Sequence, residues 1–175
     1  MRRILSIGVF AGLTMAAAWA TTLLKLSTDD MIRQSSGIVR AKVTGSYAAY
    51  RGQDIYTYYQ LQVVETLKAG GAQTMTVAIP GGAAKGLRQM VPGAPVLATG
   101  QEYVIFLWTS RSGLAQVIGL SQGLFGVTTD ASGATILVRM ASTGLMLNAK
   151  GQTVSDQPVA MTLNALKAEI AKVAQ

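Results

Sequence analysis

Alternating apolar and polar positions mark the longest predicted strand, which covers residues 55–67. Tyr56, Tyr58, Gln60 and Gln62 fall on one face of this segment, and Ile55, Thr57, Tyr59, Leu61 and Val63 fall on the other. A period of two residues is typical of a strand with one buried face. The preceding β-rich run, residues 38–43, ends at Gly45, so we expect the two runs to pair as a hairpin.

Further runs of apolar and β-branched residues predict strands at residues 74–79, 103–109, 114–120, 123–129 and 135–140. The run at 103–109 is mostly apolar, which is typical of a central strand buried on both faces. Turn-forming residues separate several of these runs, among them Ser112-Gly113 and the segment 130–133. The pattern therefore predicts a mainly β fold, either an OB-like barrel or a small sandwich.

Two segments carry helical signals. Ser27 supplies an N-cap, Asp29 and Asp30 supply first-turn acids, and Gly37 can end the turn, so a short N-terminal helix is predicted over residues 28–35. Near the other end, apolar residues recur at steps of three and four, namely Leu163, Leu166, Ile170 and Val173. This spacing predicts a C-terminal amphipathic helix that starts near Thr162 and covers one side or end of the sheet.

The segment from Pro80 to Gly100 differs in composition from the rest of the chain. It holds three of the four prolines and five glycines, and Lys85 and Arg88 are its only charges. Such a composition interrupts regular structure, and a connection of this length in a compact domain is often functional. The glycines around Lys85 lack the residue order of a phosphate-binding loop, so we expect a turn there.

The first 20 residues have the layout of a secretory signal peptide. Arg2 and Arg3 precede an apolar run at residues 4–18, and small residues follow up to Ala20. We predict cleavage after Ala20 rather than an uncleaved anchor, and export to the periplasm or the extracellular space without stable membrane insertion. Removing 20 of the 175 residues leaves residues 21–175, a single β-rich domain of 155 residues, and lowers the formal charge from +7 to +5.

Histidine and cysteine are both absent from the sequence. Without them the chain cannot form a Ser-His-Asp triad, a cysteine nucleophile, a Cys/His zinc site or a CxxC redox pair. We therefore predict no catalytic residues, no metal site and no cofactor. Two catalytic alternatives stay open: a pair of carboxylates from Asp54, Glu65 and Glu102 meeting in a pocket, or Thr21 acting as an N-terminal nucleophile.

Tyrosines concentrate on the predicted hairpin and give the candidate binding residues. These residues are Tyr47, Tyr50, Arg51, Tyr56 and Tyr58, with Lys85 and Arg88 from the long connection as cations for an acidic partner. Tyrosine suits interfaces because it buries a large area and keeps a polar tip. The alternatives are that these rings pair across the hairpin, or that they belong to a core covered by the C-terminal helix.

Several short motifs follow one another in a characteristic order. They are residues 38–43, Tyr56-Thr57-Tyr58-Tyr59, Val64-Glu65-Thr66-Leu67-Lys68, Pro80-Gly81-Gly82, residues 91–95, residues 100–107 and Gly119-Leu120-Ser121-Gln122-Gly123. This order resembles an uncharacterised family of small exported bacterial proteins. The strand layout is also similar to OB-like domains of the netrin and metalloproteinase-inhibitor type, in which a long strand ends in a leucine-lysine step. That inhibitory mechanism needs an N-terminal cysteine, so only the barrel-like fold is implied here.

These observations favour a non-catalytic binding or protein-interaction module of the bacterial cell envelope or secreted fraction. We expect its partner to be an envelope or extracellular protein or glycan, with no specific nucleic-acid binding, although the positive charge favours anionic polymers. A carboxylate-dependent or Thr21-dependent hydrolase and a structural envelope component are the alternatives. A binding protein predicts exposed tyrosines beside Lys85 or Arg88.

Overall fold

Strands make up most of the computed structural model, which describes residues 22–69, 71–142 and 144–173. The predicted signal peptide and Thr21 lie outside these residues. The strands are β1 (Thr22–Leu24), β2 (Gly37–Arg51), β3 (Asp54–Lys68), β4 (Thr74–Pro80), β5 (Gly82–Ala84), β6 (Leu87–Gln89), β7 (Glu102–Thr109), β8 (Ala115–Val117), β9 (Leu124–Thr129), β10 (Thr135–Arg139), β11 (Leu145–Leu147), β12 (Thr153–Val154) and β13 (Val159–Thr162). The helices are α1 (Thr28–Gln34) and α2 (Leu163–Val173), and in the described ranges neither is long and apolar enough to span a membrane.

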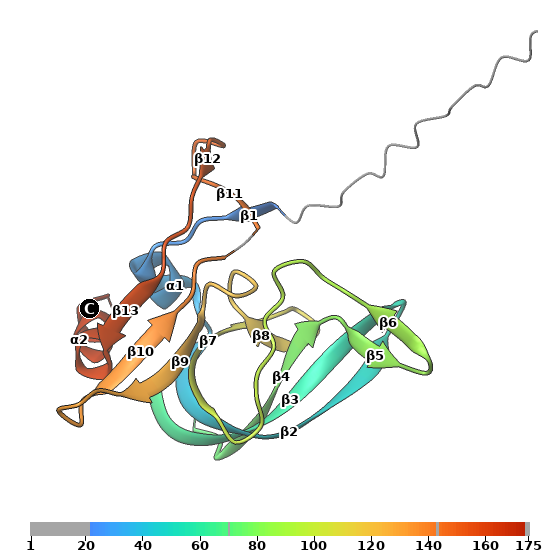
Figure 1. Ribbon diagram of the computed structural model, residues 1–175, viewed down its shortest axis with the longest axis horizontal. Helices are drawn as coiled ribbons and strands as arrows, with labels where there is room; N and C mark the ends of the chain where they lie inside the picture. The colour runs from blue at the N-terminus through green and yellow to red at the C-terminus, as the bar shows by residue number, and fades with distance from the viewer. Residues whose placement is uncertain (1–21, 70, 143, 174–175) are drawn as a thin grey trace, which may run out of the picture.

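Most strands belong to one strongly curved antiparallel sheet (Figure 1). Its order is β13-β10-β9-β7-β2-β3-β4, and β8 pairs with β7 beyond the end of β9. The curvature brings β4 beside β8, but no ladder joins these two strands in the described part of the chain. The predicted mainly β fold is therefore confirmed without a closed barrel, and a small sandwich with a C-terminal helix fits it. The short strands form two further sheets, β1-β11-β12 and β5-β6.

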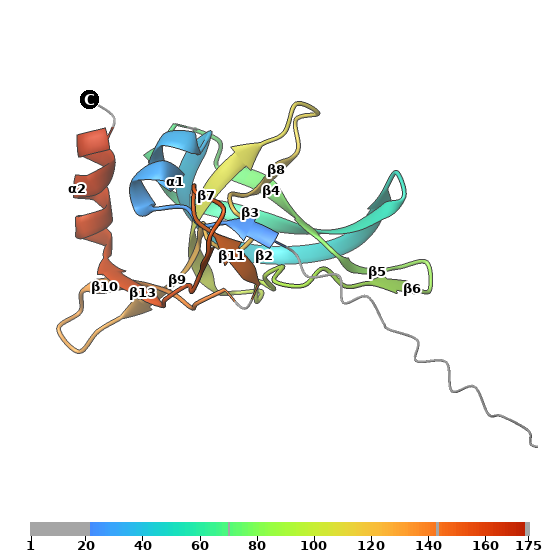
Figure 2. The same ribbon diagram turned by 90° about the horizontal axis from the view of Figure 1, so that it is seen from above.

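The middle of β7 and the first residues of β2, 37–41, are buried on both faces, as the apolar run at 103–109 predicts for a central strand. On the outer face, Ile38 and Phe106 pack under α1 and α2, which lie together on one side of the sheet (Figure 2). On the inner face of the curve, Val39 and Ile105 pack against Leu97 from the long connection. The helices thus cover the outer face of these strands, and the segment before Gly100 covers their inner face.

The predicted hairpin is formed by β2 and β3, and it is longer than the sequence indicated. Gly45 does not end β2, which continues to Arg51, because the pairing with β3 shifts by one residue between Val43 and Gly45 and forms a bulge. At this bulge Thr44 donates a hydrogen bond to the Gln60 carbonyl at 3.1 Å. A Cβ atom at Gly45 would lie 3.0 Å from the Gln60 side chain, so glycine fits the bulge closely.

Both helices start where the sequence predicts, and α1 ends slightly earlier than predicted. Ser27 and Asp30 form a capping box at its N-terminus. At its C-terminus, Ser35 rather than Gly37 is the cap, and the Lys68 ammonium donates to the carbonyls of Ile32 and Ser35. A lysine from the end of β3 therefore satisfies carbonyls that helix geometry leaves unpaired.

A buried ion pair fixes the excursion that carries β11 and β12. Arg139, at the end of β10, donates to both carboxylate oxygens of Asp156 at 2.5 and 3.0 Å, and the Ser142 amide also donates to Asp156. The side chains are 9% and 2% exposed. Hydrogen bonds from Arg139 lower the pKa of Asp156 from 3.8 to about 2, although burial opposes this shift.

Candidate functional site

The structure divides the predicted binding residues between the two faces of the β2–β3 hairpin. Tyr47 is paired with Tyr58, and Tyr56 with Ala49, so these three rings share the outer face of the sheet. Tyr50 is paired with the buried Ile55 and lies on the inner face. All four tyrosines are thus on one hairpin, as predicted, but they do not form a single cluster.

The outer group, Tyr47, Tyr56 and Tyr58, is called here the tyrosine face. The rings of Tyr47 and Tyr58 stack with centroids 5.1 Å apart and planes 15° apart, and Tyr56 lies 6.4 Å from Tyr58. Tyr47 is 53% exposed, and the other two rings are half-buried. Cross-strand pairing of the rings is therefore present, and it leaves them accessible.

The C-terminal helix does not cover the tyrosine face. In the described chain, α2 contacts β3 through the ion pair between Lys167 and Glu65. Glu65 lies near the end of β3 that is away from the hairpin turn. The alternative in which these three rings form a core beneath α2 is therefore wrong. The reason is geometric: α2 packs through Leu163, Leu166 and Ile170 onto the cluster around Phe106 instead.

The inner face of the hairpin is covered by β5 and β6. The predicted turn at Lys85 and Gly86 is confirmed, because both residues have positive φ angles, 48° and 76°. It places the Lys85 ammonium 5.9 Å from the centre of the Tyr50 ring. Arg88 lies on β6, where it is exposed. Lys85 therefore lies beside Tyr50 and Arg88 lies on β6, and both are separated by the sheet from the tyrosine face.

The hairpin end carries cations without a carboxylate partner. Arg51 lies on the same face as Tyr56 and donates to the Ser112 hydroxyl at 2.8 Å, which brings the turn containing Arg111 to this end. The ion pairs within the described chain involve Arg33, Arg40, Arg139 and Lys167, and they include none of Arg51, Lys85, Arg88 and Arg111. Their charge is therefore available to a ligand.

Polar side chains continue the outer face beyond the tyrosines. Thr44, Gln60, Gln62, Thr74 and Thr76 are all exposed and line a shallow cavity of about 520 Å³. We call these five residues the polar row. The alternation of residues 55–67 places Gln60 and Gln62 on the face of Tyr56 and Tyr58, but sequence reasoning did not include them in the site because glutamine carries no distinctive chemistry alone.

The three carboxylates considered for catalysis have separate partners. Glu102 pairs with Arg40 at 2.7 Å, Glu65 pairs with Lys167 at 2.5 Å, and Asp54 accepts a hydrogen bond from Gln89 at 3.2 Å. No group of three acidic residues that could hold a metal occurs in the described ranges. This arrangement gives no support to a carboxylate-dependent hydrolase, and Thr21 lies outside the described residues.

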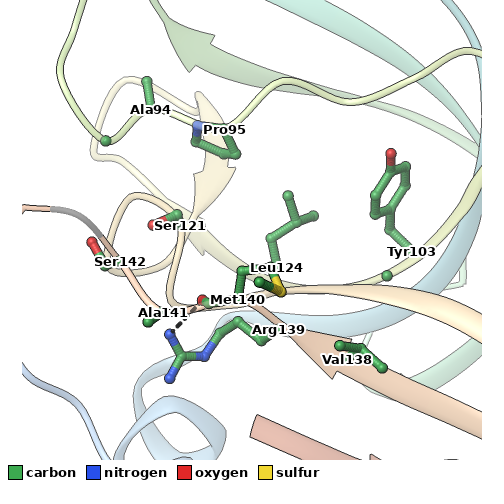
Figure 3. Close-up of a pocket in the computed structure, with 12 residues that line it drawn as sticks. Ala94, Pro95, Tyr103, Ser121, Leu124, Val138, Arg139, Met140, Ala141 and Ser142 are labelled. Atoms are coloured by element: carbon green, nitrogen blue, oxygen red, sulfur yellow. Dashed lines mark hydrogen bonds between the residues drawn. The ribbon is translucent and has the colours of Figure 1, made fainter. Parts of the chain in front are cut away.

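The long connection forms one wall of a second cavity, of about 490 Å³ (Figure 3). Ala94 and Pro95 face Leu124 of β9 and Val138 and Met140 at the end of β10. Arg139 also lines the cavity, and Figure 3 shows its guanidinium turned away from Tyr103 and hydrogen-bonded to the Met140 carbonyl. The cavity is lined mainly by apolar groups, and sequence reasoning identified only the segment that forms its wall.

Comparisons of the chain with protein-family models, with curated proteins and with solved structures gave no match. The geometry of the hairpin end and of the two cavities is therefore what bears on function.

Proposed function

We propose that the chain is a non-catalytic binding module of the cell envelope or the secreted fraction, and that it recognises a protein or glycan through the tyrosine face. One observation carries this proposal. Three tyrosines lie on the uncovered outer face of the hairpin, next to Arg51, which has no carboxylate partner in the described chain. A ring that is partly ordered by stacking loses little side-chain freedom on binding, which favours interface use.

Lys85 and Arg88 belong to this proposal as a second, separate contact. They present positive charge on the opposite side of the hairpin from the tyrosine face. A partner that wraps the hairpin end would meet both sides, whereas a partner that lies flat on the sheet would meet only the tyrosine face and Arg51. Replacing Lys85 and Arg88 together with alanine distinguishes these two modes of binding.

The test is capture with crosslinking in an envelope fraction, using the chain from Thr21 as bait. Replacing Tyr47 and Tyr58 with serine should abolish specific capture while shifting the thermal midpoint only slightly, because neither ring belongs to a core cluster and Tyr47 is 53% exposed. Val64→Ser is the matched control, since Val64 is 52% exposed on β3, the strand of Tyr58, but lies beyond the polar row. Capture that survives in the tyrosine variant would contradict the proposal.

Export is a separate part of the proposal, supported by the charge and hydrophobicity pattern of residues 1–20. Amino-terminal sequencing of the chain from the periplasmic or culture fraction should begin at Thr21. A chain that keeps Met1 and stays with the cytoplasmic fraction would contradict it.

A further inference from the structure

We infer that the outer face of β2, β3 and β4 binds an acidic polysaccharide that lies along the strands, an inference that rests on the proposed binding function and names its ligand class. The tyrosine face and the polar row are neighbours on one sheet surface, because Tyr58 and Gln60 are consecutive outward residues of β3. Together they combine flat aromatic rings with amide and hydroxyl groups. A sugar polymer offers the complementary groups, which are apolar ring faces and many hydroxyls.

The dimensions suit an extended polymer rather than a single small molecule. From Tyr56 to Gln62 the outward residues of β3 span about 20 Å, at about 3.3 Å per residue. The Tyr47–Tyr58 pair, with planes only 15° apart, provides a platform on which a ring can stack. Further along, Gln60 and Gln62 provide donors and acceptors at the side-chain amides, and the exposed threonines flank them.

Charge indicates an acidic polymer rather than a neutral one. Lys42 is exposed and paired across the hairpin with Gln62, so it stands at one end of this surface, and Arg51 stands at the other. Neither cation belongs to an ion pair of the described chain. Asp54 lies across the strands from Arg51, and Glu102 of β7 lies across from Lys42 but forms its ion pair with Arg40. Two unpaired cations that bracket a row of rings and amides complement a chain with acidic groups along its length.

The backbone of this surface favours a polysaccharide over a peptide. A peptide that adds to a sheet needs an exposed strand edge, because main-chain hydrogen bonds supply its affinity. Residues 56–62 of β3 pair with β2 on one side and with β4 on the other, so their tyrosines and glutamines stand on a face of the sheet, and the edge without a ladder beside this surface belongs to β4 in the described chain. Recognition on this face must therefore come from side chains, and the side chains present are stacking rings, amides, hydroxyls and cations.

Affinity electrophoresis of the chain from Thr21 through gels containing polygalacturonate tests the inference. Dextran is the neutral polysaccharide control. Polyglutamate and single-stranded poly-dT are the controls for acidic polymers that are not polysaccharides. We expect retardation by polygalacturonate, weakened about tenfold or more by Tyr47→Ala with Tyr58→Ala, and severalfold by Gln60→Ala with Gln62→Ala. Lys42→Ala with Arg51→Ala should reduce the retardation most strongly at low salt, because at high salt the interactions of these exposed charges are already screened.

The control variant is Val64→Ala, and all variants are checked for an unchanged thermal midpoint. The polysaccharide assignment would be overturned by any of three results: no retardation by polygalacturonate, equal retardation by polyglutamate or poly-dT, or retardation unchanged by the tyrosine and glutamine replacements. If such a result came with tyrosine-dependent capture of a protein, the proposed function would stand without the polysaccharide assignment. If neither the retardation nor the capture depended on the tyrosines, both proposals would be contradicted.

Discussion

The buried ion pair gives the sharpest test of how this fold is held together. Asp156→Asn keeps the shape of the side chain but removes its charge, so the Arg139 guanidinium loses its only carboxylate within the described residues. The pKa of Asp156 falls from 3.8 to about 2 on folding, and at 1.36 kcal/mol per pKa unit this corresponds to about 2 kcal/mol of stability at neutral pH. The variant should therefore lose about that much free energy of unfolding, which lowers the thermal midpoint by roughly 4–8 °C for a domain of this size.

The sign of the pH dependence follows from the lowered pKa. The unfolded carboxyl binds a proton more readily than the folded one, so the stabilisation is complete above about pH 4 and is lost as the pH falls toward 2. Urea unfolding of the wild type and Asp156→Asn at a series of pH values should show a difference at pH 7 that shrinks toward pH 2. Asp29→Asn changes the charge equally at an exposed position and serves as the control. A difference that is the same at both pH values, or absent at pH 7, would refute this reasoning.

Three further replacements probe single contacts. Lys68→Met should destabilise the fold by about 1–3 kcal/mol in urea unfolding, because it leaves the carbonyls at the end of α1 without their ammonium donor; an unchanged midpoint would show that water replaces the lysine fully. Gln122→Leu should speed amide exchange of β1 without unfolding the sheet, since the buried Gln122 side chain bonds to Leu24 and Leu26; exchange at the wild-type rate would contradict this clamp. Gly123→Ala should cost about 1–3 kcal/mol, because its Cβ would lie 2.6 Å from an Ile118 methyl and 2.9 Å from the Phe106 Cβ; a thermal midpoint equal to that of wild type would show that the neighbours move aside.

The long strands could be predicted from the sequence because their period-two pattern is local. Residues 55–63 alternate regularly, and the buried and exposed positions of this part of β3 largely follow that alternation. The short strands β1, β11, β12 and β13 were missed because each has two to four residues, and β1 finds its partner β11 more than 100 residues away. No local pattern predicts such a pairing, since its two strands meet only in the folded chain, where the Arg139–Asp156 pair also joins the two ends of the excursion.

The candidate site was predictable residue by residue but not as an arrangement. Alternation separates Tyr56 and Tyr58 from Ile55, yet the face of Tyr47 and Tyr50 depends on the bulge at Gly45. A one-residue shift in pairing exchanges the two faces of a strand. The position of Lys85 depends on how β5 and β6 fold back over the hairpin, and this is set by the close approach of Gly82 to Thr57, where a Cβ would lie 2.6 Å from the hydroxyl.

One face of β2 serves the core at one end and faces solvent at the other. Ile38 is fully buried on this face and Tyr47 is 53% exposed on it, and the difference arises from what covers them. The helices α1 and α2 pack over the half of the sheet that contains Phe106, whereas the hairpin extends beyond their reach (Figure 2). Large rings at uncovered positions add nothing to the cluster around Phe106, and the Tyr47–Tyr58 stack is formed on the solvent side. The same aromatic character that would indicate a core under α2 therefore supports the proposed binding surface here.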